Sequence, residues 1–109
     1  MTTISKDNKL LTLINVFTVE PAKQQELVTL LIHATESSVR YTAGFISASL
    51  HRSLDGTRVA MYAQWRSLDD YQAMRNNPTA SPYMQQAVAL AQFELGMYEV
   101  VETFSPAVA

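Results

Sequence analysis

The sequence predicts one α+β domain with a four-stranded antiparallel sheet and helices on one of its faces. Three observations predict this class: a length of 109 residues, which suits a single apolar core; an Asp55-Gly56 dipeptide between two strand-like runs; and helical patterns that lie between strand-like segments. We expect a domain over residues 10–104, a flexible N-terminus over 1–9 and a tail over 105–109.

The first two elements are a strand and a helix. Leu10 to Val19 is rich in β-branched and aliphatic residues, which predicts a strand. Pro21 suits the first turn of a helix, and Gly44 would end it. The helix is predicted from Pro21 to about Thr42, because apolar residues recur there at spacings of three and four: Leu27, Leu30, Leu31, Ala34, Val39 and Tyr41.

A hairpin follows, with strands over Phe45–Leu54 and Arg58–Arg66. Asp55-Gly56 predicts a two-residue type I′ turn, in which both central residues have positive φ. Directly opposed residues share a face of the sheet. The resulting register pairs Leu50 with Met61, Ala48 with Ala63, and Ile46 with Trp65, and with Val59 these face the helices. The opposite face is predicted to carry Phe45, Ser47, Ser49 and His51 against Ala60, Tyr62, Gln64 and Arg66.

The second half predicts a helix in two pieces and a last strand. Ser67-Leu68-Asp69-Asp70 has the form of a helix start, and Asn76-Asn77-Pro78 predicts a stop. Ser81-Pro82 opens another helix through about Gln92, with Ser81 as its cap. Leu95 to Phe104 alternates loosely and predicts the fourth strand. The order βαββαβ is the ferredoxin-like arrangement.

The uncovered face of this sheet predicts a homodimer. Its residues mix polar groups with Phe45 and Tyr62, and the chain as a whole is 48% hydrophobic but only 17% charged. Such a surface is typical of a sheet that packs on a second copy of itself.

Composition excludes several classes of function. The net charge is −2 without a run of either sign, which argues against nucleic acid as a partner. The longest apolar stretch, Leu10–Phe17, is far shorter than the roughly 20 residues of a membrane helix, and residues 1–9 do not look like a signal segment. We therefore expect a cytoplasmic protein. The chain has no cysteine, clustered histidines or Gly-rich phosphate loop, so we expect no metal, flavin or haem cofactor.

Three segments resemble antibiotic biosynthesis monooxygenase domains: Ile14 to Val19, Gly44 to Thr57 and Tyr62 to Ser67. The likeness extends from Leu10 to Thr103, and Gly44-Phe45, Asp55-Gly56 and Trp65 are its most specific parts. The resemblance implies a dimeric α/β barrel. It also implies oxidation of a polyketide-type phenol, such as an anthrone or hydroquinone, to a quinone with dioxygen and no cofactor.

Asn15 and Trp65 match the residues that serve the reaction in quinone-forming members, so the resemblance implies a catalytic role for both. Asn15 would orient the phenolic oxygen of the substrate and stabilise negative charge, and the indole N–H of Trp65 would hold a carbonyl or peroxide oxygen. The structural alternatives are an amide satisfied by neighbouring backbone and a tryptophan that only packs in the core.

An adaptable apolar cavity is predicted around these two residues. The alternative is that its lining residues simply fill the core. The residues predicted to bind the substrate are Met61, Tyr71, Met74, Tyr83, Met84 and Met97.

Neither histidine is predicted to be catalytic. The hairpin register places His51 on the face opposite Trp65, and His33 lies in the first helix without a second ligand for a metal. The predicted pocket therefore holds no histidine.

Two other functions remain open. Some members carry an asparagine where this chain has Met61, and a thioether cannot donate a hydrogen bond to an oxyanion, which favours a non-catalytic binder of small molecules. The second open function is haem degradation. Relatives that degrade haem use a histidine after the third strand, and this sequence has no histidine between Ser67 and Gln92, which argues against that function.

Overall fold

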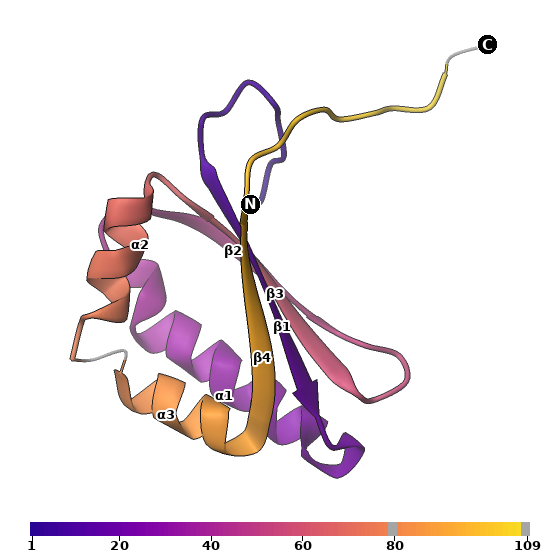
Figure 1. The fold of residues 1–109 in the computed structure, drawn as a ribbon, viewed down its shortest axis with the longest axis vertical. Helices are drawn as coiled ribbons and strands as arrows, with labels where there is room; N and C mark the ends of the chain where they lie inside the picture. The colour runs from indigo at the N-terminus through magenta and orange to yellow at the C-terminus, as the bar shows by residue number, and fades with distance from the viewer. Residues whose placement is uncertain (79–80, 108–109) are drawn as a thin grey trace.

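A four-stranded antiparallel sheet with helices on one side forms the molecule (Figure 1). The computed structural model describes residues 1–78 and 81–107. The strands are β1 Leu11–Val19, β2 Phe45–Arg52, β3 Arg58–Trp65 and β4 Ala91–Tyr98, in the order β2-β3-β1-β4. The helices are α1 Gln24–Ser37, α2 Leu68–Arg75 and α3 Ser81–Leu90, with short 3-10 helices at Pro21–Lys23 and Val39–Tyr41. The predicted α+β, ferredoxin-like fold is confirmed.

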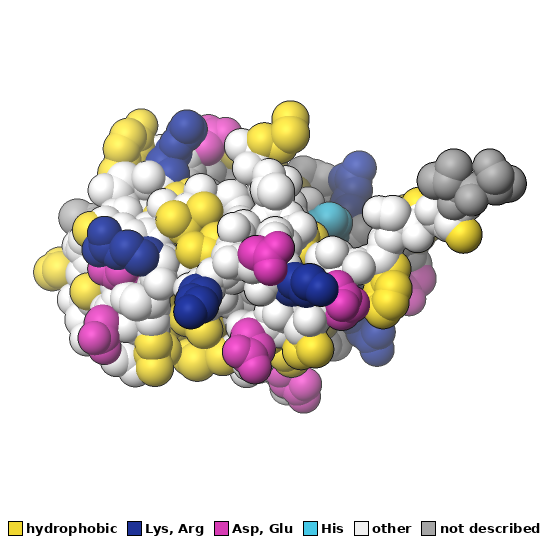
Figure 2. All heavy atoms as spheres, turned by 90° about the horizontal axis from the view of Figure 1, so that it is seen from above, with side chains coloured by type: hydrophobic (Ala, Val, Ile, Leu, Met, Phe, Trp, Pro, Cys, Tyr) yellow, Lys and Arg dark blue, Asp and Glu magenta, His cyan; other side chains and the backbone are white. Residues whose placement is uncertain are grey.

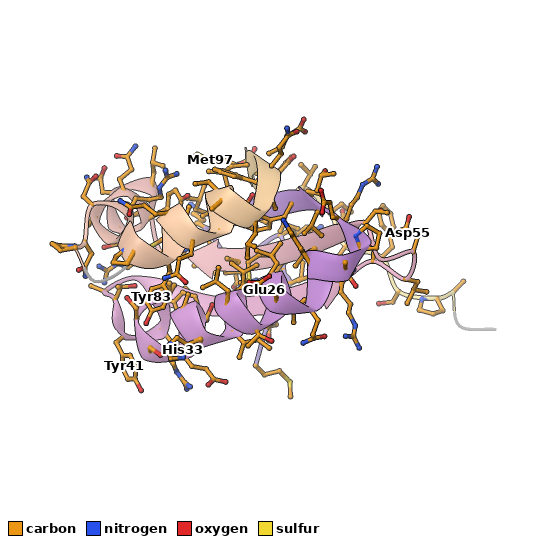
Figure 3. The ribbon with its side chains drawn as sticks, turned by 90° about the horizontal axis from the view of Figure 1, so that it is seen from below. Glu26, His33, Tyr41, Asp55, Tyr83 and Met97 are labelled. Atoms are coloured by element: carbon orange, nitrogen blue, oxygen red, sulfur yellow. The ribbon has the colours of Figure 1, made fainter. Side chains whose placement is uncertain are left out.

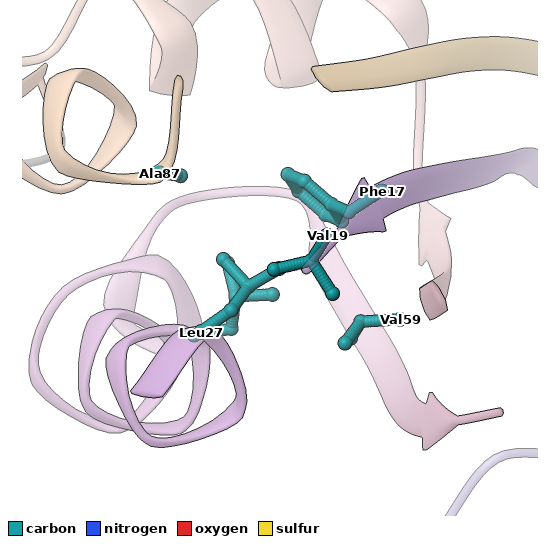
Figure 4. Packing of buried hydrophobic residues seen from close by; sticks show 6 residues of the cluster. Phe17, Val19, Leu27, Val59 and Ala87 are labelled. Atoms are coloured by element: carbon teal, nitrogen blue, oxygen red, sulfur yellow. The ribbon is translucent and has the colours of Figure 1, made fainter. Parts of the chain in front are cut away.

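Two clusters of buried side chains join the sheet to the helices. One gathers where α1 and α3 cross β1 and β3 (Figure 4), and its members are Phe17, Val19, Leu27, Leu31, Val59 and Ala87. The other lies under α2 and consists of Leu13, Ala63, Trp65, Tyr71 and Met74. Both use the alternate residues of β1 and β3 that point toward the helices, as the period of two in a strand requires.

The start of α2 is fixed by a side-chain cap, as predicted. The Ser67 hydroxyl accepts a hydrogen bond from the Asp70 amide at 3.2 Å and donates one to the Asp70 carboxylate at 2.8 Å. Arg66 binds the same carboxylate with two nitrogens, at 2.8 and 2.9 Å. The hydrogen bonds from Arg66 and then Ser67 lower the pKa of Asp70. The corresponding cap predicted at Ser81 falls outside the described side chains.

The hairpin has the predicted register but a different turn. Leu50 opposes Met61 and Ala48 opposes Ala63, as expected. Among the described residues, however, only glycines have positive φ, so Asp55 does not adopt the type I′ conformation. The Asp55 carboxylate instead accepts hydrogen bonds from the Thr57 hydroxyl and amide at 2.7 and 3.0 Å, and these lower its pKa to about 2.

A β-bulge in β2 overturns the prediction for Phe45 and Ile46. Trp65 opposes Phe45 instead of Ile46, because one extra residue is inserted between Phe45 and Ser47. Since side chains alternate along a strand, the insertion exchanges the faces of the residues before it. Phe45 therefore lies against Trp65 on the helix side, and Ile46 is 48% exposed.

The last helix ends earlier than predicted, and the last strand both begins and ends earlier. α3 ends at Leu90 and β4 starts at Ala91, whereas the pattern predicted a helix to Gln92 and a strand over Leu95–Phe104. β4 pairs with β1 from Val19 opposite Ala91 to Thr12 opposite Tyr98, so the length of β1 determines where β4 ends. The predicted continuous helix from Pro21 to Thr42 is likewise divided, with α1 flanked by the two 3-10 helices.

The N-terminal segment contacts the uncovered face of the sheet. Gln64, which is 3% exposed, donates a hydrogen bond to the Thr3 carbonyl at 2.7 Å and accepts one from Ser47 at 2.7 Å. Lys6 and Glu102 form an ion pair of 3.0 Å between the two terminal segments. In the described residues no helix is long and apolar enough to cross a membrane. Figure 2 shows a face on which basic and acidic side chains are interspersed instead of gathered by sign.

Two glycines with the same backbone angle should respond differently to alanine. Gly44 and Gly56 both have φ of 83°, a region that costs an L-residue roughly 1 to 2 kcal/mol. A Cβ at Gly56 would meet only Pro21, at 3.5 Å, whereas at Gly44 it would overlap the Asp70 side chain that Arg66 holds in place. We expect Gly44→Ala to lower the free energy of unfolding by roughly 2 to 5 kcal/mol and Gly56→Ala by about 1 kcal/mol. Urea unfolding measures both, and equal losses would contradict the account of Gly44.

Candidate functional site

An apolar cavity lies between the helix side of the sheet and the three helices. Its volume is about 120 Å³. The strands contribute the floor and, through Trp65 at the end of β3, one wall, and the helices contribute the other walls. The described lining residues are Leu13, Asn15, Phe17, Leu31, Ala34, Thr35, Val39, Phe45, Ala48, Met61, Ala63, Trp65, Tyr71, Met74, Arg75, Tyr83, Met84 and Leu95.

Asn15 is the polar group in the floor of this cavity. It occupies the middle of β1, between Met61 of β3 and Leu95 of β4. Its Oδ1 atom is buried and has no hydrogen-bond partner, and among the described residues it is the only buried side-chain oxygen or nitrogen in that condition. Leaving a buried polar atom unpaired costs about 1 to 3 kcal/mol. The alternative in which neighbouring backbone satisfies this amide is therefore not realised, and the atom is free to bind a ligand.

Trp65 forms a wall of the cavity beside the end of β3. It is 1% exposed, and its ring meets Phe45 and Tyr71 edge to face at centroid distances of 5.4 and 5.7 Å. The residue thus packs in the core, as the structural alternative expected, and also borders the cavity. Its indole nitrogen, unlike Asn15 Oδ1, is not among the buried side-chain atoms that lack a partner. The polar atom of the site that is buried without a partner is therefore the Asn15 oxygen.

Most residues predicted to bind the substrate border the same cavity. They come from β3, α2 and α3, and they are Met61, Tyr71, Met74, Tyr83 and Met84. Met97 does not border it and is 47% exposed. The register opposite Leu13 turns Met97 to the helix side, but the far end of β4 extends beyond α3. Figure 3 shows Met97 at the edge of the molecule, on the other side of α3 from Tyr83.

Sequence reasoning did not assign several lining residues to the site, and two of them, Phe45 and Arg75, add an aromatic ring and a charge. Phe45 was assigned to the wrong face of the sheet, because nothing in the sequence pattern predicts the β-bulge at Ile46. Arg75 follows Tyr71 by four residues on α2, and residues at that spacing share one face of a helix. That spacing could have placed Arg75 next to the predicted pocket.

Neither histidine borders the cavity. His51 is exposed on the uncovered face of the sheet, as predicted, and its Nε2 lies 2.9 Å from the Ser49 hydroxyl. His33 is exposed on α1, where its ring meets Tyr83 edge to face at 5.5 Å. The described residues contain no group of three or more histidine, cysteine, aspartate or glutamate side chains that could hold a metal.

The size of the cavity sets a condition on its ligand. An engineered cavity of about 150 Å³ in another protein binds benzene. A cavity of about 120 Å³ therefore admits one aromatic ring, and a larger ligand must displace side chains or extend past the helices. Met61, Met74 and Met84 are suited to the first alternative, because unbranched methionine side chains adapt readily to new shapes.

Comparison with known proteins identifies relatives along almost the whole chain. The family model described as antibiotic biosynthesis monooxygenase matches residues 10–90. The tetracenomycin-F1 monooxygenase of Streptomyces glaucescens is 41% identical over 104 residues, which is 95% of this chain and 93% of that protein.

Solved structures share the fold. The ActVA-Orf6 monooxygenase of Streptomyces coelicolor, solved with nanaomycin D, superimposes with a TM-score of 0.79 at 27% identity and covers 90% of this chain and 93% of its own. The cofactor-independent oxygenase SnoaB of Streptomyces nogalater gives a TM-score of 0.70 at 22% identity, over 89% of this chain and 98% of its own.

Proposed function

Since this chain belongs to the antibiotic biosynthesis monooxygenase family, we propose that it is a cofactor-independent monooxygenase acting on an electron-rich, polyketide-type aromatic. The single observation that supports catalysis most is the unpaired buried oxygen of Asn15 in an otherwise apolar cavity. If this cavity had no polar task, an aliphatic residue in place of Asn15 would make the protein more stable, because no buried oxygen would be left unpaired.

The proposed reaction converts the CH₂ group of an anthrone to a carbonyl. Loss of one proton gives an enolate, which passes an electron to dioxygen, and the two radicals join through a new C–O bond. The resulting peroxide anion takes up one proton from water to become a hydroperoxide. The carbon then loses its second hydrogen as a proton while the O–O bond breaks and hydroxide leaves, which gives the quinone and one water. The substrate supplies the electrons, so the protein needs to bind it, assist its deprotonation and exclude bulk water.

Asn15 and Trp65 are assigned the two polar tasks. The amide of Asn15 accepts a hydrogen bond from the phenol of the substrate and, through its nitrogen, stabilises the oxyanion left by deprotonation. The indole N–H of Trp65 donates to the peroxide oxygen. The described lining contains no histidine or carboxylate, so the proton passes to water at the open side of the cavity.

Oxygen uptake tests the function directly. Purified protein is mixed with a panel of anthrones and hydroquinones, and oxygen consumption and quinone absorbance are followed together. We expect one dioxygen to be consumed for each anthrone oxidised, with one atom of ¹⁸O₂ retained in the new carbonyl. Binding of these compounds without oxygen uptake above the spontaneous rate would overturn the proposal and support the binder.

A methionine at position 61 favours the alternative function, a non-catalytic binder of small molecules. It lies directly across from Asn15 on β3, where an amide could share the oxyanion, and its thioether cannot donate a hydrogen bond. We expect Met61→Asn to raise turnover of an anthrone several-fold while lowering the free energy of unfolding by about 1 to 3 kcal/mol, because a polar group enters an apolar cavity. Steady-state oxygen uptake and urea unfolding measure the two effects. A loss of turnover in a folded Met61→Asn protein would contradict this role for the position.

The proposed oligomer is a homodimer joined through the uncovered face of the sheet. Ile14 and Val16 of β1 and Tyr62 of β3 point to that face, on the side opposite Asn15 and Met61. A specific interface of this kind buries about 800 Å² per partner. We expect Ile14→Lys to produce monomers, since a charge would enter the interface, whereas Ile32→Lys, at a residue 44% exposed on α1, should not. Sedimentation at micromolar concentration measures both, and a monomeric parent protein would refute the dimer.

A further inference from the structure

Arg75 is the one charged residue among the described residues that line the cavity. We propose that it binds a carboxylate of the substrate, so that the ligand of this site is an aromatic acid and not merely a neutral phenol. This inference rests on the proposed function, because it names the class of substrate for the same cavity.

Tyr71 holds the guanidinium at the rim of the cavity. The two residues are one turn apart on α2, and Nη1 of Arg75 donates a hydrogen bond of 3.2 Å to the Tyr71 hydroxyl. The Arg75 Cζ lies 5.9 Å from the centre of the Tyr71 ring, which is 7% exposed and packs against Trp65 at 5.7 Å. The positive charge of this exposed residue therefore lies at the rim, beside the wall of the cavity that Trp65 forms.

Arg75 forms no ion pair with any of the described residues. The ion pairs among the described residues join Lys6 to Glu102, Lys23 to Glu20 and Arg66 to Asp70. Asp70 lies on the same helix as Arg75, but Arg66 binds both of its oxygens. Among the described residues, the side chain of Arg75 donates one hydrogen bond, to the neutral hydroxyl of Tyr71, and most of its donors remain for a ligand.

A carboxylate suits this arrangement better than the other anions an aromatic ligand could carry. A guanidinium presents parallel N–H donors that match the two oxygens of a carboxylate. A phosphate would bring a second charge that this lining does not balance. The phenolate of the reaction is assigned to Asn15 in the floor, on β1, whereas Arg75 belongs to a helix wall. The substrate would thus span the site with its phenol at the floor and its acid at the rim.

Binding of unreactive probes tests the substrate class. The probes are 2-naphthoate, its neutral analogue 2-naphthamide, and 2-naphthol, and calorimetry gives their affinities for the full chain. Trp65 is the only tryptophan, so its single indole N–H resonance reports whether a probe occupies the cavity. Arg75→Met removes the charge and keeps most of the apolar stem. The matched control is Arg40→Met, because Arg40 also lies 5.9 Å over a tyrosine ring, that of the exposed Tyr41, away from the cavity.

We expect the parent protein to bind 2-naphthoate about tenfold more tightly than 2-naphthamide, with a shift of the Trp65 resonance. Arg75→Met should abolish this preference, and Arg40→Met should keep it. Equal affinities for the acid and the amide in the parent, or an Arg75→Met protein that keeps the preference, would overturn the assignment. So would a loss confined to 2-naphthol, which would make Arg75 a phenolate ligand.

These outcomes are separate from those of the oxygen assay. The probes need no oxidation, so a preference for the acid that depends on Arg75 can be found in a protein that consumes no oxygen. Conversely, oxygen uptake with neutral anthrones beside a failed naphthoate test would leave the monooxygenase in place and remove only the aromatic acid.

Discussion

Asn15→Ala is expected to reduce turnover of an anthrone by about 10² to 10³-fold while the protein remains folded, because it removes a hydrogen-bonding group from the position of the oxyanion. The fold should tolerate the change well. The Oδ1 atom of Asn15 is buried without a partner, so its removal relieves a cost instead of breaking a bond. Lower turnover with equal or higher stability is the combination that a purely structural asparagine would not give. Oxygen uptake and urea unfolding, measured on the same preparation, provide the two values.

His51→Ala serves as the control for this experiment. His51 is exposed on the face of the sheet opposite Asn15, so its loss should change turnover by no more than a few-fold as long as the dimer persists. An inactive, folded and dimeric His51→Ala protein beside an active Asn15→Ala protein would show that the reaction takes place on the other face.

The parts of the fold that sequence predicted well are set by local chemistry. Ser67 and Asp70 form hydrogen bonds with each other across the first turn of α2, so a serine three residues before an aspartate in the sequence was enough to predict where the helix starts. Asp55-Gly56 placed the hairpin and its register even though the turn differs: β2 ends at Arg52 and β3 starts at Arg58, so the loop is longer than the predicted two residues, but it is centred on the same dipeptide and keeps the pairing. Asn15 was assigned to the site through the family resemblance, and the pairing of β1 with β3 places it on the same face of the sheet as Trp65.

The parts that it missed depend on neighbours distant in the sequence. The bulge at Ile46 exchanges the faces of β2 at one end, which moved Phe45 into the cavity. Met97 points to the helix side of the sheet, as predicted from the alternation of side chains. It is nevertheless exposed, because α3 is too short to cover this end of β4. Arg75 is the exception, because its contact with Tyr71 is local and the spacing of four residues on α2 could have placed it beside the pocket.

Trp65→Phe is expected to lower turnover of an anthrone by about 10²-fold, since phenylalanine keeps an aromatic ring in the wall but has no N–H to donate to the peroxide oxygen. This substitution also removes volume from a side chain that is 1% exposed and packed between Phe45 and Tyr71. Some loss of stability should therefore accompany the loss of turnover. On its own, Trp65→Phe does not separate the donor from the packing.

Replacement of tryptophan by β-(3-benzothienyl)alanine separates them. Because Trp65 is the only tryptophan, biosynthetic incorporation of this isostere changes one site, where sulfur takes the place of the N–H and the ring size is nearly kept. If the indole N–H acts in the reaction, the substituted protein should lose turnover about as strongly as Trp65→Phe while its urea unfolding stays close to that of the parent. A substituted protein with parental turnover, beside a slow and destabilised Trp65→Phe, would reduce Trp65 to a packing residue and leave Asn15 as the polar group on which the proposed chemistry depends.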